Sequence, residues 1–158
     1  HLAAELFKNM AGVNIVRINF KGTGPALTAV ISGEVQMMFP AAGSATPHMK
    51  SGRLKALAVS TAEPSALAPG LPTLAASGLP GYESESHTGI FVPAGTPSKI
   101  IAVLQRNMAR TLNTPEVKKR LFGLGLEVIA DTPAQFTAFI KSEIARMQEL
   151  VKSAGLKE

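Results

Sequence analysis

The sequence of 158 residues has no cysteine and no tryptophan, and it holds one tyrosine, Tyr82, and one aspartate, Asp131. The lack of cysteine excludes thiol catalysis, disulfides and cysteine-based metal sites. No apolar run approaches the roughly 18 residues of a membrane-spanning helix, which excludes an integral membrane protein. Charged residues make up only 17% and hydrophobic residues 46%. This balance excludes a disordered or highly charged scaffold and is sufficient for a buried core.

Basic residues outnumber acidic ones by sixteen to eleven, so the formal net charge is +5. They are spread along the chain, and the densest cluster, Lys118-Lys119-Arg120, falls on a predicted helix. Aromatic residues amount to 5% and do not alternate with the basic ones, so there is no stacking platform for bases. We therefore expect no nucleic-acid binding, and instead a solvated basic surface with a mild attraction for anionic ligands.

Hydrophobic periodicity predicts strands and helices in alternation over the first sixty residues, which indicates βαβ units, a mostly parallel sheet and an α/β fold. A Pro- and Gly-rich connector follows over residues 61–85, and further helices precede the end of the chain. The predicted strands are residues 13–20, 34–39, 54–60, 88–92 and 126–129. The predicted helices are residues 1–11, 26–32, 46–50, 98–112, 115–122 and 134–154, with Gly33 closing the second, Pro25 opening it and Asp131 capping the last.

The loop from Lys21 to Pro25 (Lys-Gly-Thr-Gly-Pro) lies between a predicted strand and a predicted helix. Its glycines, Gly22 and Gly24, would let backbone N–H groups converge on an anion, and the helix dipole and the Thr23 hydroxyl add to the attraction. The loop matches neither the P-loop spacing nor GxGxxG. Such loops also serve simply as tight connections, so small-anion binding and a structural turn both remain open.

A second candidate lies at the end of the next predicted strand, in Pro40, Ala41, Ala42, Gly43 and Ser44. Ligands of open α/β sheets bind beyond the carboxyl ends of strands, and these small residues would expose backbone donors there. Ser44 is interpreted either as a helix cap or as a ligand contact.

Catalysis and metal binding find little support in the sequence. Ser44 and His48 are four residues apart and could form a nucleophile–base pair, but a third member and a GxSxG elbow are absent. The histidines and carboxylates show no metal-ligand spacing, so we expect neither a metal nor a cofactor. His87 is interpreted as a ligand donor in a cleft wall or as a surface histidine.

Several runs resemble the tripartite tricarboxylate transporter substrate-binding proteins, also called Bug proteins, in the order found in that family. The runs are HLAAELFKNMAGVNIVRINFKGTGPALTAVISGEVQMMF, KSGRLKALAVSTAEPS, LPTLAASGLPGYE, FVPAGTPSKII and DTPAQFTAFIKSEIARMQELVKSAG. The chain looks like the C-terminal half of such a protein. The resemblance implies a type II periplasmic binding protein fold, with two α/β lobes that close on a ligand. It implies that residues 1–85 belong to the second, ligand-binding lobe and that residues 86–158 return to the first lobe.

The resemblance also implies a periplasmic protein that delivers a small carboxylate to membrane permease subunits, without catalysis or a cofactor. The implied ligand-binding residues are Lys21, Gly22, Thr23, Gly24, Pro40, Ala41, Ala42, Ser44 and His87. Three of the positions expected around the cleft differ from the family pattern: Phe20 replaces a common Tyr, Pro40 a common Asp, and His87 a frequent Trp. These departures bear on ligand identity.

Two other functions remain as alternatives. An effector-sensing domain of a transcription regulator can share this fold, and a small hydrolase is the third class. We also expect that apolar surface, left uncovered in a half-length chain, favours self-association.

Overall fold

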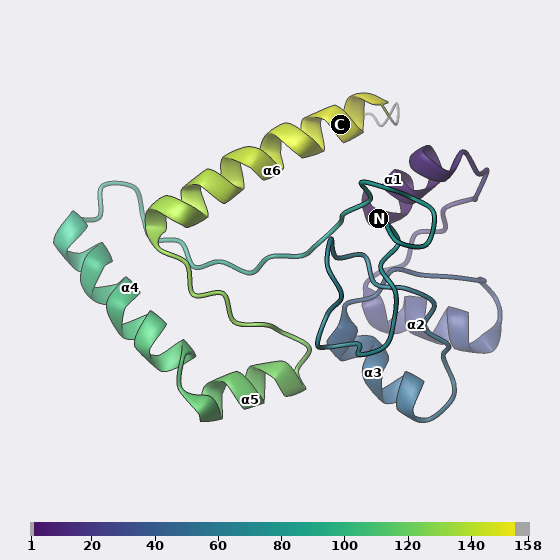
Figure 1. Ribbon diagram of the computed structural model, residues 1–158, viewed down its shortest axis with the longest axis horizontal. Helices are drawn as coiled ribbons and strands as arrows, with labels where there is room; N and C mark the ends of the chain where they lie inside the picture. Colours follow the sequence, from purple (N-terminus) through teal and green to yellow (C-terminus); the bar gives the residue numbers. More distant parts are fainter. Residues whose placement is uncertain (1, 154–158) are drawn as a thin grey trace. The chain divides into compact units, whose positions relative to one another are not determined.

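The computed structural model describes residues 2–153, which form helices separated by extended segments and turns (Figure 1). The chain divides into two compact units, His1–Ser86 and His87–Glu158. The helices are α1 (Leu2–Ala11), α2 (Thr23–Ser32) and α3 (Ala42–Lys50) in the first unit, and α4 (Ser98–Leu112), α5 (Pro115–Gly123) and α6 (Pro133–Ser153) in the second.

The helices agree closely with the sequence predictions. Gly33 ends α2 in the left-handed conformation, with φ of 80°, and its N–H donates to the Val30 carbonyl. Two details differ. Helix α2 begins at Thr23, so Pro25 is its third residue rather than its first. The predicted end of the last helix, Ala154, lies outside the described residues.

Asp131 was predicted to cap α6, but the structure shows a different residue in that role. The cap is formed by Thr132, whose N–H donates to Gln135 Oε1 at 3.0 Å while its Oγ1 accepts from the Gln135 N–H at 3.3 Å. This reciprocal pair is a capping box, and it satisfies donors that helix geometry leaves without an internal partner.

The predicted α/β pattern is not confirmed in the described residues. The five predicted strand segments, residues 13–20, 34–39, 54–60, 88–92 and 126–129, contain no strand within residues 2–153. Over that range the one isolated bridge is parallel and joins Val59 to Thr73. Around it, Val59 N–H donates to Pro72 O at 2.9 Å and Leu74 N–H to Val59 O at 3.0 Å. A strand exists only as part of a ladder, so extended segments that lack paired neighbours do not qualify.

The core of the first unit draws on its three helices and on the connector. Tyr82 is 1% exposed, and its hydroxyl donates to the Ala3 carbonyl at 2.8 Å, which ties the end of the connector to α1. The buried residues of this unit also include Leu27 and Ala29 of α2, Ala45 of α3, Thr73 and Glu5.

Glu5 is a buried charge on α1, and it is compensated by two cations. Lys8 Nζ lies 3.1 Å and Arg17 Nη1 3.6 Å from its carboxylate oxygens. A charge taken out of water is tolerated only with such partners. Because Arg17 belongs to the extended segment 13–20, this pair also holds that segment against α1.

The second unit is held by aromatic contacts and has no buried residue among those described. The ring of Phe136 lies 5.6 Å from that of Phe91 and 6.4 Å from that of Phe139, between centroids. A methyl group on Gly89 would overlap the Phe136 ring, so a larger residue there requires that ring to move. Large apolar side chains stay exposed, among them Ile90 at 69% and Phe91 at 75%.

In the part of the chain from residue 2 to 153, no helix combines the length and the apolar character required to cross a membrane.

Candidate ligand-binding site

The first candidate loop is exposed and ends at an uncapped helix. Residues 21–24 are all exposed, and Gly22 N–H donates to Phe20 O at 2.9 Å. Gly22 is the N-cap of α2 with φ of 105°, a conformation that favours glycine, and no side chain caps the helix. The first N–H groups of a helix have no partner within it. The amides of Thr23 and Gly24 are therefore available to an acceptor.

The second candidate loop leads into α3 in the same way. Ala41 is the N-cap, with φ of −64° and ψ of 142°, and no side chain caps this helix either. The Ala41 carbonyl accepts from the N–H groups of Ser44 at 3.1 Å and Ala45 at 3.2 Å. The amides of Ala42 and Gly43 precede these bonds and are the donors left at the helix start.

Ser44 does not act as the N-cap. Its hydroxyl donates to the Ala41 carbonyl at 2.8 Å, one turn back in the same helix. To donate to a ligand, the hydroxyl would have to rotate away from that carbonyl. The hydroxyl proton points to Ala41 and not to His48, and His48 Nδ1 is buried without a hydrogen-bond partner. The geometry therefore offers no support for a Ser44–His48 nucleophile pair.

His87 is the first residue of the second unit, whereas the other predicted ligand residues belong to the first. Its ring is exposed and lies 4.1 Å from the Phe139 ring of α6, between centroids. One turn further along α6, Glu143 accepts hydrogen bonds from Arg146 at 2.9 and 2.7 Å. Those bonds lower the pKa of Glu143, with a smaller contribution from the nearby His87 charge. His87 thus takes part in an aromatic and charged cluster, and its role toward a ligand stays a prediction.

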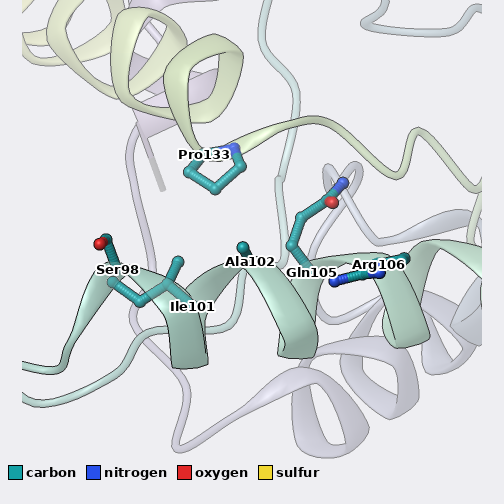
Figure 2. Close-up of a pocket in the computed structure, with 6 residues that line it drawn as sticks. All are labelled: Ser98, Ile101, Ala102, Gln105, Arg106 and Pro133. Carbon is teal, nitrogen blue, oxygen red and sulfur yellow. The ribbon is translucent and has the colours of Figure 1, made fainter.

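A separate hollow of about 480 Å³ lies in the second unit, between α4 and the start of α6. Figure 2 shows Pro133 opposite a row of side chains from α4. The hollow is lined by Ser98, Ile101, Ala102, Gln105, Arg106 and Pro133. None of these belongs to the predicted ligand-binding set, and Arg106 is the charged member. Among residues 2–153, no group of His, Asp and Glu is arranged to hold a metal ion.

Comparison with known proteins identifies the family. The sequence profile of the tripartite tricarboxylate transporter family receptor matches residues 1–156. The chain belongs to this receptor family. A protein encoded in the clcB-clcD intergenic region of Pseudomonas knackmussii is 36% identical over 152 residues, which cover 96% of this chain and 90% of that protein. BugT of Bordetella pertussis is 32% identical over 157 residues, which cover 99% of this chain and 48% of BugT.

Solved structures place this receptor-family chain among periplasmic binding proteins. R. palustris Rpa4515, solved with adipate, matches 98% of the chain with a TM-score of 0.88 and 34% identity. BugD, a periplasmic binding protein, matches 99% of it with a TM-score of 0.81 and 31% identity. MatC from Rhodopseudomonas palustris, solved with malate, matches 95% with a TM-score of 0.81 and 32% identity.

The receptor-family chain spans about half the length of most of these relatives. It covers 52% of the Rpa4515 chain, 53% of BugD and 52% of MatC. The periplasmic binding protein fold that the sequence resemblance implied is supported by these neighbours, although the expected strands are not formed in the described residues.

Proposed function

We propose that this chain is the carboxylate-binding part of a periplasmic solute-binding protein that serves a tripartite tricarboxylate-type transporter. One observation carries the proposal: the first unit presents two helix starts, exposed at Thr23 and half-buried at Ala42, that no side chain caps. The family match and the likeness to structures solved with adipate and malate support it.

An uncapped helix start suits a carboxylate for two reasons. The free N–H groups donate hydrogen bonds that are strengthened when the acceptor is charged. The helix dipole places roughly half a positive charge at the same end. Lys21 precedes the N-cap Gly22 of α2 and adds a full positive charge to the first loop. Since α2 and α3 each offer such an end, the proposed ligand is a small organic acid, with two carboxylates as in adipate or malate.

The remaining parts of the proposed role follow the family. Residues 1–85 act as the ligand-binding part of the second lobe, and residues 86–158 return to the first lobe, with His87 facing the cleft. Closure of the lobes traps the acid, which is then passed to permease subunits in the membrane. The role is binding without catalysis, in keeping with the Ser44 hydroxyl donating to a backbone carbonyl rather than to a base.

The chain spans about half the length of most of its relatives, and this length should affect how tightly it binds a ligand. A site shared between two lobes loses contacts and the closure motion when much of one lobe is missing. We expect the 158-residue chain to bind more weakly than a version extended to the length of BugT. We also expect self-association through the uncovered apolar side chains of α4, such as Ile100, Val103 and Leu104. Equal affinity in the two lengths would contradict the first expectation, and a strictly monomeric chain in sedimentation would contradict the second.

Isothermal titration calorimetry tests the proposal. The chain is titrated with adipate and malate, and with adipamide as a neutral control of the same length as adipate. Binding of the acids but not of the diamide supports recognition of carboxylates. Equal binding of adipate and adipamide, or no binding of any acid by either the chain or its extended version, would reject the proposal.

A further inference from the structure

Helix α1 contacts both of the chain segments that lead into the proposed carboxylate site. The rings of Phe7 and Phe39 lie 5.8 Å apart between centroids, tilted by 54°. Phe39 is followed by Pro40 and then by Ala41, the N-cap of α3. On the same helix, Glu5 holds Arg17 at 3.6 Å, and Arg17 lies four residues before Lys21. Neither aromatic residue was predicted to bear on ligand binding, because their spacing is that of core positions.

We infer that Phe7 and Glu5 are positioning residues for the carboxylate site. Phe7 sets the start of α3 through Phe39, and Glu5 sets the loop before α2 through Arg17. This inference rests on the proposed function for its consequence on binding, whereas its structural part can be tested without any ligand.

The Phe7 contact acts over a short and stiff connection. Proline fixes its own φ, and Ala41 is extended with φ of −64° and ψ of 142°. A shift of the Phe39 ring is therefore passed directly to the Ala42 and Gly43 amides. No side-chain cap holds these amides in place. Hydrogen bonds weaken steeply with distance and angle, so their strength depends on what anchors the helix start.

The Glu5 contact acts over a longer connection. The Glu5 side chain is 10% exposed, and Lys8 and Arg17 share its carboxylate. The Val13 N–H also donates to Lys8 O at 3.2 Å, so the segment after α1 is held at its beginning as well. Between Arg17 and the loop the chain forms neither a helix nor a strand. The expected effect of Glu5 on the loop is therefore smaller than that of Phe7 on α3.

Amide NMR spectra separate a positioning role from a general contribution to stability. The variants are Phe7→Leu and Glu5→Gln, and the reporters are the N–H signals of Gly43 in α3 and of Gly22 and Gly24 in the first loop. Phe7→Leu should shift the Gly43 signal and leave the other two in place. Glu5→Gln should do the reverse. A general loss of stability would shift the glycine signals of both loops in each variant.

The matched controls carry the same substitutions elsewhere. Phe122→Leu changes a half-exposed ring on α5, and Glu63→Gln removes an exposed carboxylate of the first unit. Both controls should leave the three glycine signals unchanged. If Phe7→Leu unfolds the chain, Phe7→Met and Phe39→Leu are the milder versions, and the same glycine signals are read in them.

Affinity for adipate, measured by calorimetry, gives the functional result. We expect about fivefold weaker binding for Phe7→Leu, within the range of an aromatic pair. For Glu5→Gln we expect about threefold, because the Arg17 side chain of this ion pair is 36% exposed and its charge stays solvated without Glu5. Glycine signals that stay in place in both variants would overturn the inference, whatever the affinity. If the unchanged protein binds no adipate or malate, the proposed function fails, and the glycine signals still decide whether α1 positions the loops.

Discussion

Replacing Ala42 with proline removes a single hydrogen-bond donor from the proposed site and little else. Ala42 is the first residue of α3, where proline is well tolerated because its missing N–H has no partner within the helix. The preceding residue, Ala41, has φ of −64° and ψ of 142°, a conformation that proline accepts in its neighbour. The fold should therefore stay intact while one of the two free amides, those of Ala42 and Gly43, disappears.

The size of the effect follows from the bond that is lost. A hydrogen bond to a charged acceptor contributes about 1.5 to 3 kcal/mol. The loop is partly open to water, so we take the lower end of that range. Since about 1.4 kcal/mol corresponds to a factor of ten in affinity, Ala42→Pro should weaken adipate binding about tenfold. The melting temperature should change little.

Calorimetric titration with adipate measures the loss, and Ser98→Pro is the matched control. Ser98 is the first residue of α4, after the N-cap Pro97, which has φ of −57° and ψ of 137°. The same amide is removed there from an equivalent position outside the predicted site. We expect unchanged affinity in this control. If Ala42→Pro binds adipate as tightly as the unchanged chain, or if both variants lose affinity equally, the helix start at Ala42 does not recognise the carboxylate.

Three further predictions concern stability. Burial raises the pKa of Tyr82 to about 12 from its ordinary value of 10.0. As the pH rises, the Tyr82 hydroxyl therefore loses its proton in the unfolded chain before it does so in the folded chain. The free energy of unfolding should consequently fall between pH 10 and pH 12. Urea unfolding at pH 7 and pH 11 should show this fall, and Tyr82→Phe should remove it while costing about 1 kcal/mol at pH 7 through the lost bond to Ala3. Gly89→Ala should destabilise the second unit by about 1 to 3 kcal/mol, because the new methyl group overlaps the Phe136 ring. Adding Phe136→Leu to this variant should restore part of the lost stability. An unchanged thermal transition in Gly89→Ala would contradict this prediction. Thr132→Ala should cost about 1 kcal/mol through the lost cap of α6, measured as a lower urea midpoint, whereas the neighbouring change Asp131→Asn should leave the midpoint in place.

The helices could be predicted because their signals are local. An α-helix forms its hydrogen bonds between residues four apart, so a stretch of about ten residues carries the information for its own bounds. The glycine at position 33 predicted the end of α2, and the apolar spacing from residue 98 to 112 predicted α4. The two candidate loops were predictable for the same reason, since small residues before a helix are visible in the sequence.

The strands could not be predicted reliably from the same kind of pattern. Alternating apolar residues, as in segment 13–20, describe a chain that can enter a sheet, but a ladder needs a partner strand from elsewhere in the fold. Residues 2–153 supply only the bridge between Val59 and Thr73. The alternating pattern therefore indicated an extended conformation. It could not show whether the segment has a partner strand to pair with.

The sequence by itself determined the positions of the helices, the glycine- and proline-containing loops that precede α2 and α3, and the family resemblance, because all of these depend on neighbouring residues or on residue order. Only the tertiary structure decided which distant residues meet. Phe7 reaches Phe39, Glu5 reaches Arg17, and Tyr82 reaches Ala3 across 79 positions of sequence. Such contacts depend on how the elements pack in three dimensions, and no periodicity along the chain encodes them.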